Sequence, residues 1–182
     1  MKTIIITFLS IISVFVTSCS KSDDNTETTL ELTYLEKQDL IFLREEEKLA
    51  RDVYLYAYEK YQEQIFYNIS QSEKKHMNSV LYLLNKYNLE DPVIEELGVF
   101  SNQDLQQLYS QLTAQVDISL IEALKVGATI EDLDIKDIVE FDSNTQNIDI
   151  LNVYSSLMCG SRNHLRSFTD QLDLRANTYN PQ

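Results

Sequence analysis

Residues 72–76 are Ser-Glu-Lys-Lys-His, a Glu73-x-x-His76 spacing inside a stretch whose apolar residues recur with the period of an amphipathic helix. Positions three apart share one helix face, so the Glu73 carboxylate and the His76 imidazole point the same way and can bind one metal ion together. The chain has two histidines. Because His164 lies in the last long helical segment, the sequence raises the question whether both histidines meet acidic residues at one inward-facing metal site.

The composition of the 182 residues favours one all-helical domain with a core of its own. Gly 3 and Pro 2 leave few turn-forming residues, and long runs of Leu, Glu, Lys, Gln and Ala favour helix. The formal net charge of −14 disfavours a nucleic-acid partner, because little positive charge is available to neutralise phosphates. An acidic, solvated exterior accounts for this charge, so the charge alone does not indicate a metal site.

Helical periodicity predicts four long helices and a short helix between the second and the third. Ser101 is expected to cap the short helix and Ser119 the third long one, which residues 142–144 are expected to break. Two helix pairs with a longer middle connection predict a ferritin-like four-helix bundle. A bundle with a plain apolar core and outward-facing charges fits the same pattern. The expected helices span residues 34–61, 65–87, 101–112, 120–139 and 148–174.

Glu47 interrupts the apolar stripe of the first helix on its buried side, because it lies four residues after Leu43 and three before Ala50. A carboxylate is costly to bury unless a cation or another partner compensates it. This position therefore favours a metal ligand. The alternative is a solvated, charged helix face made of Glu45, Glu46, Glu47, Lys48 and Arg51.

Heights along the two helix pairs test whether the acidic candidates can meet the histidines. Residues equidistant from the turn of an antiparallel pair lie at one level. Glu131 and His164 lie at nearly equal sequence distances from the expected turn at residues 142–147. The same is true of Asp134 and Ser161, so both pairs are expected near one height. The two glutamates of the first pair have a midpoint roughly one helical turn, about 5 Å, from their expected turn. The agreement is good in the second pair and fair in the first.

Three of these motifs resemble those of rubrerythrins. The residues Glu-Lys-Leu-Ala-Arg-Asp-Val-Tyr at 47–54 resemble the first-helix motif Glu-x-x-Ala-Arg-x-x-Tyr, whose glutamate is an iron ligand. Glu73-x-x-His76 matches the second-helix ligand pair, and Glu131-x-x-Asp134 resembles the third-helix acidic pair, with aspartate in place of glutamate. The longer strings at 44–54 and 160–166 are similar to a ferritin-like domain-of-unknown-function family of bacteria and archaea. The resemblance covers about residues 35–174.

The resemblance implies a site for one or two iron ions, with manganese or zinc as alternatives. One departure concerns the fourth helix, where rubrerythrins carry Glu-x-x-His and this chain has Ser161-x-x-His164. The lost carboxylate puts a full di-iron centre in doubt unless Asp134 supplies the missing oxygen. The clustered cysteines of a rubredoxin-like part are absent from the sequence. The predicted metal ligands are Glu47, Glu73, His76, Glu131, Asp134 and His164.

The N-terminus has the features of an export signal, with a basic start, a short apolar run and small residues before Cys19. Val16-Thr17-Ser18-Cys19 resembles the bacterial lipobox, which implies a lipid on Cys19 and membrane attachment in the cell envelope, at the outer membrane or the surface. A plain cleaved signal is the alternative. The expected segments are a signal at 1–18, a flexible acidic tether at 19–33, the helical domain at 34–175 and a tail at 176–182.

Two classes of function fit the sequence. The preferred one is a lipid-anchored iron protein with ferroxidase or peroxide-reducing activity, whose electron donor the sequence does not indicate. The alternative is a non-catalytic surface bundle that binds a protein or an envelope component, with a structural metal or none. A homodimer is compatible with either class. Cys159 is expected to be a buried, small apolar residue, and Gly127 and Gly160 to mark close contacts between helices.

Overall fold

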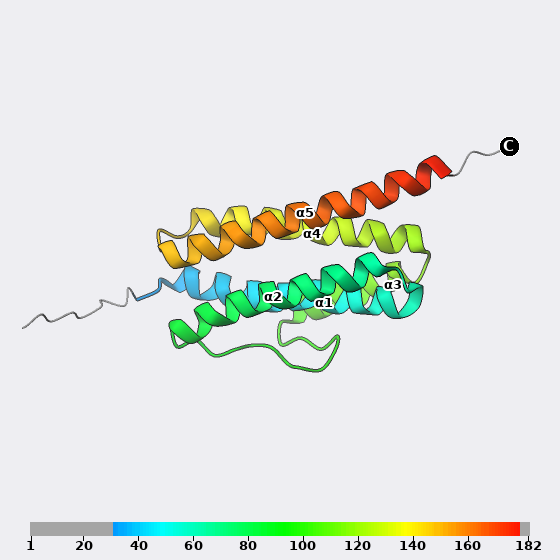
Figure 1. The fold of residues 1–182 in the computed structure, drawn as a ribbon. Coiled ribbons are helices and arrows are strands. Elements are labelled where there is room, and N and C mark those ends of the chain that lie inside the picture. The colour runs from blue at the N-terminus through cyan, green and yellow to red at the C-terminus, as the bar shows by residue number, and fades with distance from the viewer. Residues whose placement is uncertain (1–30, 179–182) are drawn as a thin grey trace, which may run out of the picture.

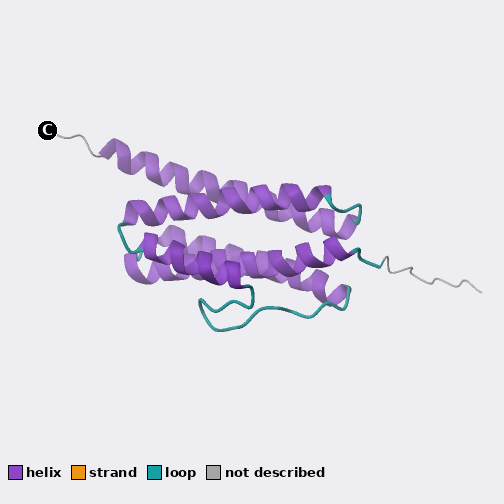
Figure 2. Ribbon diagram, turned by 180° about the vertical axis from the view of Figure 1, so that it is seen from behind, coloured by secondary structure: helices purple, strands orange, loops and turns teal. Residues whose placement is uncertain are grey.

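The computed structural model describes residues 31–178, which form five helices and no strand (Figures 1 and 2). The expected all-helical class is therefore confirmed. The predicted signal segment, Cys19 and the tether up to residue 30 lie outside the described residues. The helices are α1 (Tyr34–Tyr61), α2 (Gln64–Lys86), α3 (Gln103–Val116), α4 (Leu120–Ser143) and α5 (Ile148–Thr178).

Local capping explains where several helices begin. The Thr33 hydroxyl accepts a hydrogen bond from the Glu36 amide of α1, and the Glu36 carboxylate accepts one from the Thr33 amide, which is a capping box. Ser119 caps α4 as expected, accepting from the Glu122 amide at 3.2 Å. The predicted cap of α3 was wrong by one residue, because the Asn102 side chain accepts from the first amides of that helix.

The helices pack in two pairs, α1 with α2 and α4 with α5. Contacts between α1 and α4 and between α2 and α5 join the pairs, and the short α3 packs against α1 and α4. Figure 1 shows α4 and α5 lying over α1 and α2, with the last turns of α5 extending past the other helices. None of the helices within residues 31–178 is long and apolar enough to cross a membrane.

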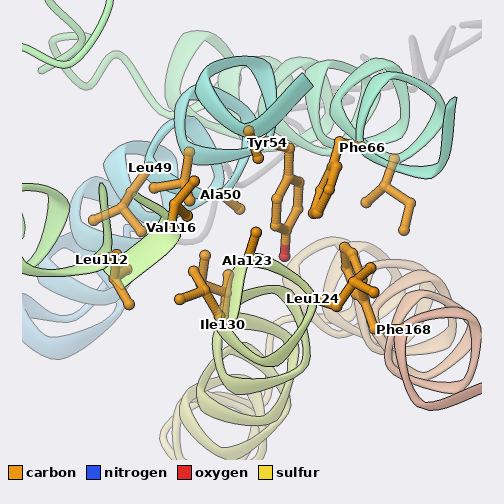
Figure 3. Packing of buried hydrophobic residues seen from close by; sticks show 14 of the residues in the cluster. Leu49, Ala50, Tyr54, Phe66, Leu112, Val116, Ala123, Leu124, Ile130 and Phe168 are labelled. Carbon is orange, nitrogen blue, oxygen red and sulfur yellow. The ribbon is translucent and has the colours of Figure 1, made fainter. Parts of the chain in front are cut away.

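The buried apolar residues form two clusters. Tyr54, Phe66 and Phe168 lie in the first cluster, which Figure 3 shows, and Leu40 and Tyr154 lie in the second. On each long helix the two clusters occupy different stretches, and the predicted metal ligands lie in the stretch between them. The sequence thus places a polar layer between two apolar layers. Its members are Glu47, Glu73, His76, Glu131, Asp134, Ser161 and His164, all buried.

The alternative of a solvated charged face on α1 was wrong for most of its residues. Glu45, Glu46, Glu47 and Lys48 are buried, and Arg51 is only partly exposed. The sequence suggests solvation because charged residues usually stay in water. Glu45 and Lys48 are buried because the loop between α2 and α3 folds back over their face of α1, whereas Glu47 faces His76 inside the bundle.

Buried charges on α1 hold that loop. Lys48 Nζ lies 2.6 Å from Asp52 Oδ2 and donates to the carbonyls of Glu96 at 3.0 Å and Val99 at 3.1 Å. Neither the Lys48 nor the Asp52 side chain is exposed to solvent. Asp52 also accepts from the Gly98 amide at 2.9 Å. Each buried charge therefore has several polar partners, as burial of an ion requires.

The expectation for Cys159 was also wrong, because its thiol is exposed on α5. Gly160, the next residue, marks a close helix contact as expected. Cys159 was expected to be buried because cysteine is small and apolar. Adjacent residues of a helix point about 100° apart, however, so Gly160 can face a neighbouring helix while Cys159 faces water.

Candidate metal centre

Two groups of ligand atoms occupy the polar layer, each with the types of side chain that bind a metal ion. Glu47, Glu73 and His76 form the first group, and Glu73, Glu131 and His164 form the second. Within each group the nearest ligand atoms all lie within 4.8 Å of one another, and all five residues are buried. Glu73 belongs to both groups.

The two oxygens of Glu73 face different histidines. Oε2 lies 2.8 Å from His76 Nδ1, and Oε1 lies 2.8 Å from His164 Nδ1. Each histidine also has a second carboxylate nearby, with Glu47 Oε2 3.2 Å from His76 Nδ1 and Glu131 Oε2 3.4 Å from His164 Nδ1. The two imidazole rings are stacked, with centroids 5.5 Å apart. Glu73 thus has the position of a carboxylate that bridges two ions.

The polar atoms of the centre are close together without forming a complete set of hydrogen bonds. Glu47 Oε1, Glu73 Oε1 and His164 Nδ1 are buried and have no hydrogen-bond partner, although the last two are only 2.8 Å apart. Two ligand atoms at about 2.1 Å from one ion and at right angles lie about 3 Å apart. The spacings therefore fit an ion placed between these atoms as well as they fit hydrogen bonds.

Neighbouring residues position the ligands. The Tyr54 hydroxyl donates to Glu131 Oε1 at 2.6 Å, and this leaves Glu131 Oε2 to face His164. Gly160 of α5 lies against the His76 ring, since a Cβ at this position would be 2.4 Å from Nε2 and 2.6 Å from Cε1. Any larger residue at position 160 would therefore force the His76 ring to move.

Asp134 lies beside the two groups and belongs to neither. Its Oδ2 accepts a hydrogen bond from the Ser161 hydroxyl, and its Oδ1 is buried without a partner. The serine that replaces the expected glutamate of α5 therefore binds the aspartate of α4. The structure brings five of the six predicted ligands together and holds the sixth at their edge.

The chain matches a known family over most of its length. Residues 36–182 match the family described as "Uncharacterized protein domain (DUF2202)". The chain belongs to the DUF2202 family. The similarity to rubrerythrins is not tested by this match and stays a prediction.

Among similar proteins is the "Uncharacterized protein MJ0754" of Methanocaldococcus jannaschii. It is 54% identical over 148 residues, which are 81% of this chain and 80% of that protein. The crystal structure of hypothetical protein MJ0754 from Methanococcus jannaschii DSM 2661 has a TM-score of 0.79 at 53% identity, covering 83% of this chain and 87% of that one. The DUF2202 fold is thus shared between the two proteins.

In this DUF2202 chain the histidines are surrounded by negative charge. Burial alone would lower the pKa of His76, but hydrogen bonds to Glu47 and Glu73 outweigh it and raise the pKa to about 11. The pKa of His164 rises to about 9 because Glu131 and Glu73 outweigh burial in the same way. Without metal, both imidazoles therefore carry a proton at neutral pH.

The carboxyl groups of the centre differ in their protonation. Although burial alone would raise the pKa of Glu73, the imidazoles of His164 and His76 beside its two oxygens lower it to about 2, so this carboxylate stays charged. Burial raises the pKa of Glu131 to about 8 and that of Asp134 to about 6. Burial and the charge of Asp134 raise the pKa of Glu47 well above its usual value. Without a cation, protons bound to these carboxyl groups therefore neutralise part of the negative charge of the centre.

Glu46 is a buried acidic residue that the sequence did not single out. It lies next to Glu47 on α1 and is 8% exposed. The signal was available, because Glu46 lies three residues after Leu43 and four before Ala50, which also places it in the buried stripe. Periodicity alone does not distinguish Glu46 from Glu47.

Proposed function

We propose that this chain is a lipid-anchored, ferritin-like metal protein that holds iron between its four long helices and uses it in ferroxidase or peroxide-reducing chemistry. One observation carries the proposal: the two oxygens of Glu73 face two different histidines, each with a further glutamate nearby. Such a carboxylate joins two ion sites. Carboxylates with one imidazole per ion suit iron, and manganese or zinc fits the same ligands.

The distribution of ligands over the helices supports a ferritin-like bundle. Ferritin-like carboxylate proteins take one glutamate from each of two helices and a Glu-x-x-His pair from each of the other two. Here α1 supplies Glu47, α4 supplies Glu131, and α2 supplies the pair Glu73 and His76. Because α5 supplies His164 without the glutamate, Glu73 is the one carboxylate common to both groups that would hold the ions.

The chain's own residues would bind and orient the reactants. Iron bound here would supply the one-electron chemistry that reduction of oxygen or peroxide requires. Three protein ligands for each ion leave space for a small oxygen-containing substrate. The apolar layers on both sides exclude bulk water, and Tyr54 keeps Glu131 in place through its 2.6 Å hydrogen bond. Asp134 Oδ1, which has no partner, can hold or release a proton near neutral pH at the edge of the centre.

The lipid anchor is a separate part of the proposal. It depends on Val16-Thr17-Ser18-Cys19 and on the apolar run before it. Cys19→Ala in the full chain is expected to leave the protein without lipid and to release it from membranes. Mass measurement of the protein made in a bacterial host tests this part independently of the metal.

Metal content tests the centre. The full chain is loaded with Fe²⁺ without oxygen, freed of unbound iron and analysed for metal. We expect two ions per chain in the natural protein and about one in His76→Ala and in His164→Ala, because each histidine serves one group. Equal metal content in all three proteins would contradict the assignment of the histidines as ligands.

Neighbouring acidic residues on α4 provide a matched control. Glu131→Gln removes a buried ligand, whereas Asp132→Asn removes the same charge from an exposed position next to it. We expect Glu131→Gln to lose one ion and Asp132→Asn to keep both. Equal loss in the two variants would show that general acidity, and not the centre, holds the metal.

Turnover separates the two classes of function. Iron-loaded protein is expected to consume peroxide, or to oxidise added Fe²⁺ with oxygen, faster than the same amount of free iron. Metal binding without either reaction would favour the alternative, a surface bundle with a structural metal.

A further inference from the structure

A groove lies between α1 and α4. It has a volume of about 400 Å³ and contains several acidic side chains and no lysine or arginine. Phe42 of α1 and Phe141 of α4 form part of its wall, on the side of the molecule away from the histidine-bearing α2 and α5. The acidic residues that line it are Asp39, Glu45, Asp137 and Glu140.

Glu46 and Asp134 continue the two walls of the groove toward the metal centre. Glu46 follows Phe42 by four residues, and Asp134 precedes Asp137 by three, so each lies about one turn further along the same helix face. Asp134 borders the centre, and Glu46 is next to Glu47 on α1. Acidic side chains therefore extend from the surface groove to the metal ligands without an intervening basic residue among them.

Two buried oxygens in this passage have no partner. Glu46 Oε2 and Asp134 Oδ1 make no hydrogen bond, although Glu46 is 8% and Asp134 5% exposed. Burial and the negative charges of Asp134 and Asp137 raise the pKa of Glu46 well above its usual value, so these carboxyl groups lie close enough to repel one another. A buried carboxylate oxygen without a partner is costly, and a cation with its water is the partner that a cluster of carboxylates binds.

We propose that Glu46 and Asp137 form an accessory site for a hydrated divalent cation, through which metal ions pass from the groove between α1 and α4 to the centre. Small hard cations are commonly bound by one or two carboxylates and keep several waters. Such a site binds weakly, which suits transit. The inference rests on the proposed function only for the destination of the ion, because the accessory site can bind a cation whether or not the centre does.

Asp137 is suited to the outer position and Glu46 to the inner one. The Asp137 side chain is 22% exposed and lies 3.5 Å from Lys136 Nζ, which itself is largely in water and gives only a weak ion pair. Asp137 can therefore accept an ion from solvent. Glu46 lies deeper along α1 and binds the ion next, before it moves to the groups around Asp134.

Mn²⁺ is the probe, because the magnetic resonance signal of the free ion reports binding directly. The full natural chain is expected to bind Mn²⁺ tightly at the centre and one further ion more weakly. Glu46→Gln and Asp137→Asn are each expected to lose the weak ion and to fill the centre about tenfold more slowly, since acidic clefts raise cation on-rates by at least that factor. The final content of the centre stays the same.

Asp132→Asn is the matched control, because it removes one charge from an exposed position of α4 outside the groove. The proposal is overturned if Glu46→Gln and Asp137→Asn load as fast as Asp132→Asn and keep the weak ion. Should Glu46→Gln fail to fold, Asp137→Asn decides, since its side chain is partly exposed.

A variant of the centre distinguishes this inference from the proposed function. The double variant His76→Ala, His164→Ala removes one ligand from each group and is expected to lose tight binding and to keep the weak ion. If the natural chain shows only a weak ion, and that ion depends on Glu46 and Asp137, the proposed function fails and the accessory site stands. Absence of any bound Mn²⁺ overturns both.

Discussion

Glu73 couples the two halves of the centre at the scale of a single residue. Each of its oxygens lies 2.8 Å from a different histidine, so a change at one half moves a group that the other half needs. Occupation of the two ion sites is therefore expected to be linked, and the effect of each ion on the other must be equal in free energy.

Proton competition at the histidines gives metal binding a defined pH dependence. The pKa values of about 11 for His76 and about 9 for His164 mean that both must lose a proton to bind an ion at pH 7. Affinity is expected to rise from pH 6 to pH 8, by about tenfold per pH unit for each proton displaced. Mn²⁺ titrations at several pH values measure the slope.

His164→Ala is the control. In this variant the slope of metal affinity against pH should decrease by the equivalent of one displaced proton, because one histidine is missing. An affinity that does not change between pH 6 and pH 8 would show that the ions bind without displacing protons from the histidines.

Gly160 is expected to be required for metal binding more than for stability. In Gly160→Ala the new Cβ would lie 2.4 Å from His76 Nε2, so the ring must move, while alanine itself favours the helix by about 1 kcal/mol. We expect loss of the ion in the Glu47, Glu73 and His76 group, with a small change in the thermal midpoint of the metal-free protein. Metal analysis and thermal unfolding measure the two effects.

Gly127→Ala is the matched substitution in the apolar core. Its Cβ would lie 2.5 Å from the Phe168 ring, which belongs to the first apolar cluster. This variant should lower the thermal midpoint and keep its metal stoichiometry. The reverse pattern in the two variants would contradict the role given to Gly160.

At the scale of the helix, α1 has two functions on two faces. One face supplies Glu47 to the centre, and the other holds the loop between α2 and α3 through Lys48 and Asp52. Lys48 also lies over the Phe100 ring, 4.2 Å from its centroid. The loop therefore depends on a buried charge.

Lys48→Met is expected to destabilise the protein by about 2 kcal/mol, because Arg51 still pairs with Asp52 Oδ1 but the buried Lys48 partners, Asp52 Oδ2 and the Glu96 and Val99 carbonyls, lose their donor. Urea unfolding measures the change. Lys60→Met is the control, since Lys60 forms a comparable ion pair with Asp117 at 2.5 Å on the surface, where water replaces it. Equal losses of stability in the two variants would show that burial does not make the ion pair between Lys48 and Asp52 more important for stability than a surface pair.

The sequence predicted the helices well where the signals are local. Ser119 caps α4 as expected, and α1 has the predicted ends, because caps and periodicity depend on neighbouring residues. The burial of Lys48 and the exposure of Cys159 were not predicted, because they depend on which distant segment covers a helix face. Loop packing leaves no periodic pattern in the sequence.

The candidate site was largely predictable for the same reason. Spacing along each helix, together with equal heights in each helix pair, identified Glu73, His76, Glu131 and His164. Equal heights also placed Asp134 beside Ser161, but the sequence did not predict the hydrogen bond from the Ser161 hydroxyl that holds its carboxylate at the edge of the centre. A single hydrogen bond decided whether that side chain joins the ligands.

At the scale of the whole molecule, metal bound at the proposed centre is expected to stabilise the fold. Ions bound at 100 times their dissociation constant each stabilise the folded state by about 2.7 kcal/mol. A chelator should therefore lower the thermal midpoint. The loss should be larger at pH 9 than at pH 7, because the protonated histidines that balance the carboxylates without metal lose their protons as the pH rises through about 9.

Scanning calorimetry with and without chelator at the two pH values measures this difference. The His76→Ala, His164→Ala double variant should respond to neither chelator nor pH in this range. A natural chain whose thermal midpoint is unchanged by chelator at both pH values would argue against bound metal.

The division of the ligands between the helix pairs has a consequence for biosynthesis. Glu47, Glu73 and His76 all lie on α1 and α2, whereas the second group must combine Glu73 with residues of α4 and α5. A ribosome releases α1 and α2 first. The first ligand group is thus complete as soon as α1 and α2 have paired, and the second is complete only after the last helix has docked.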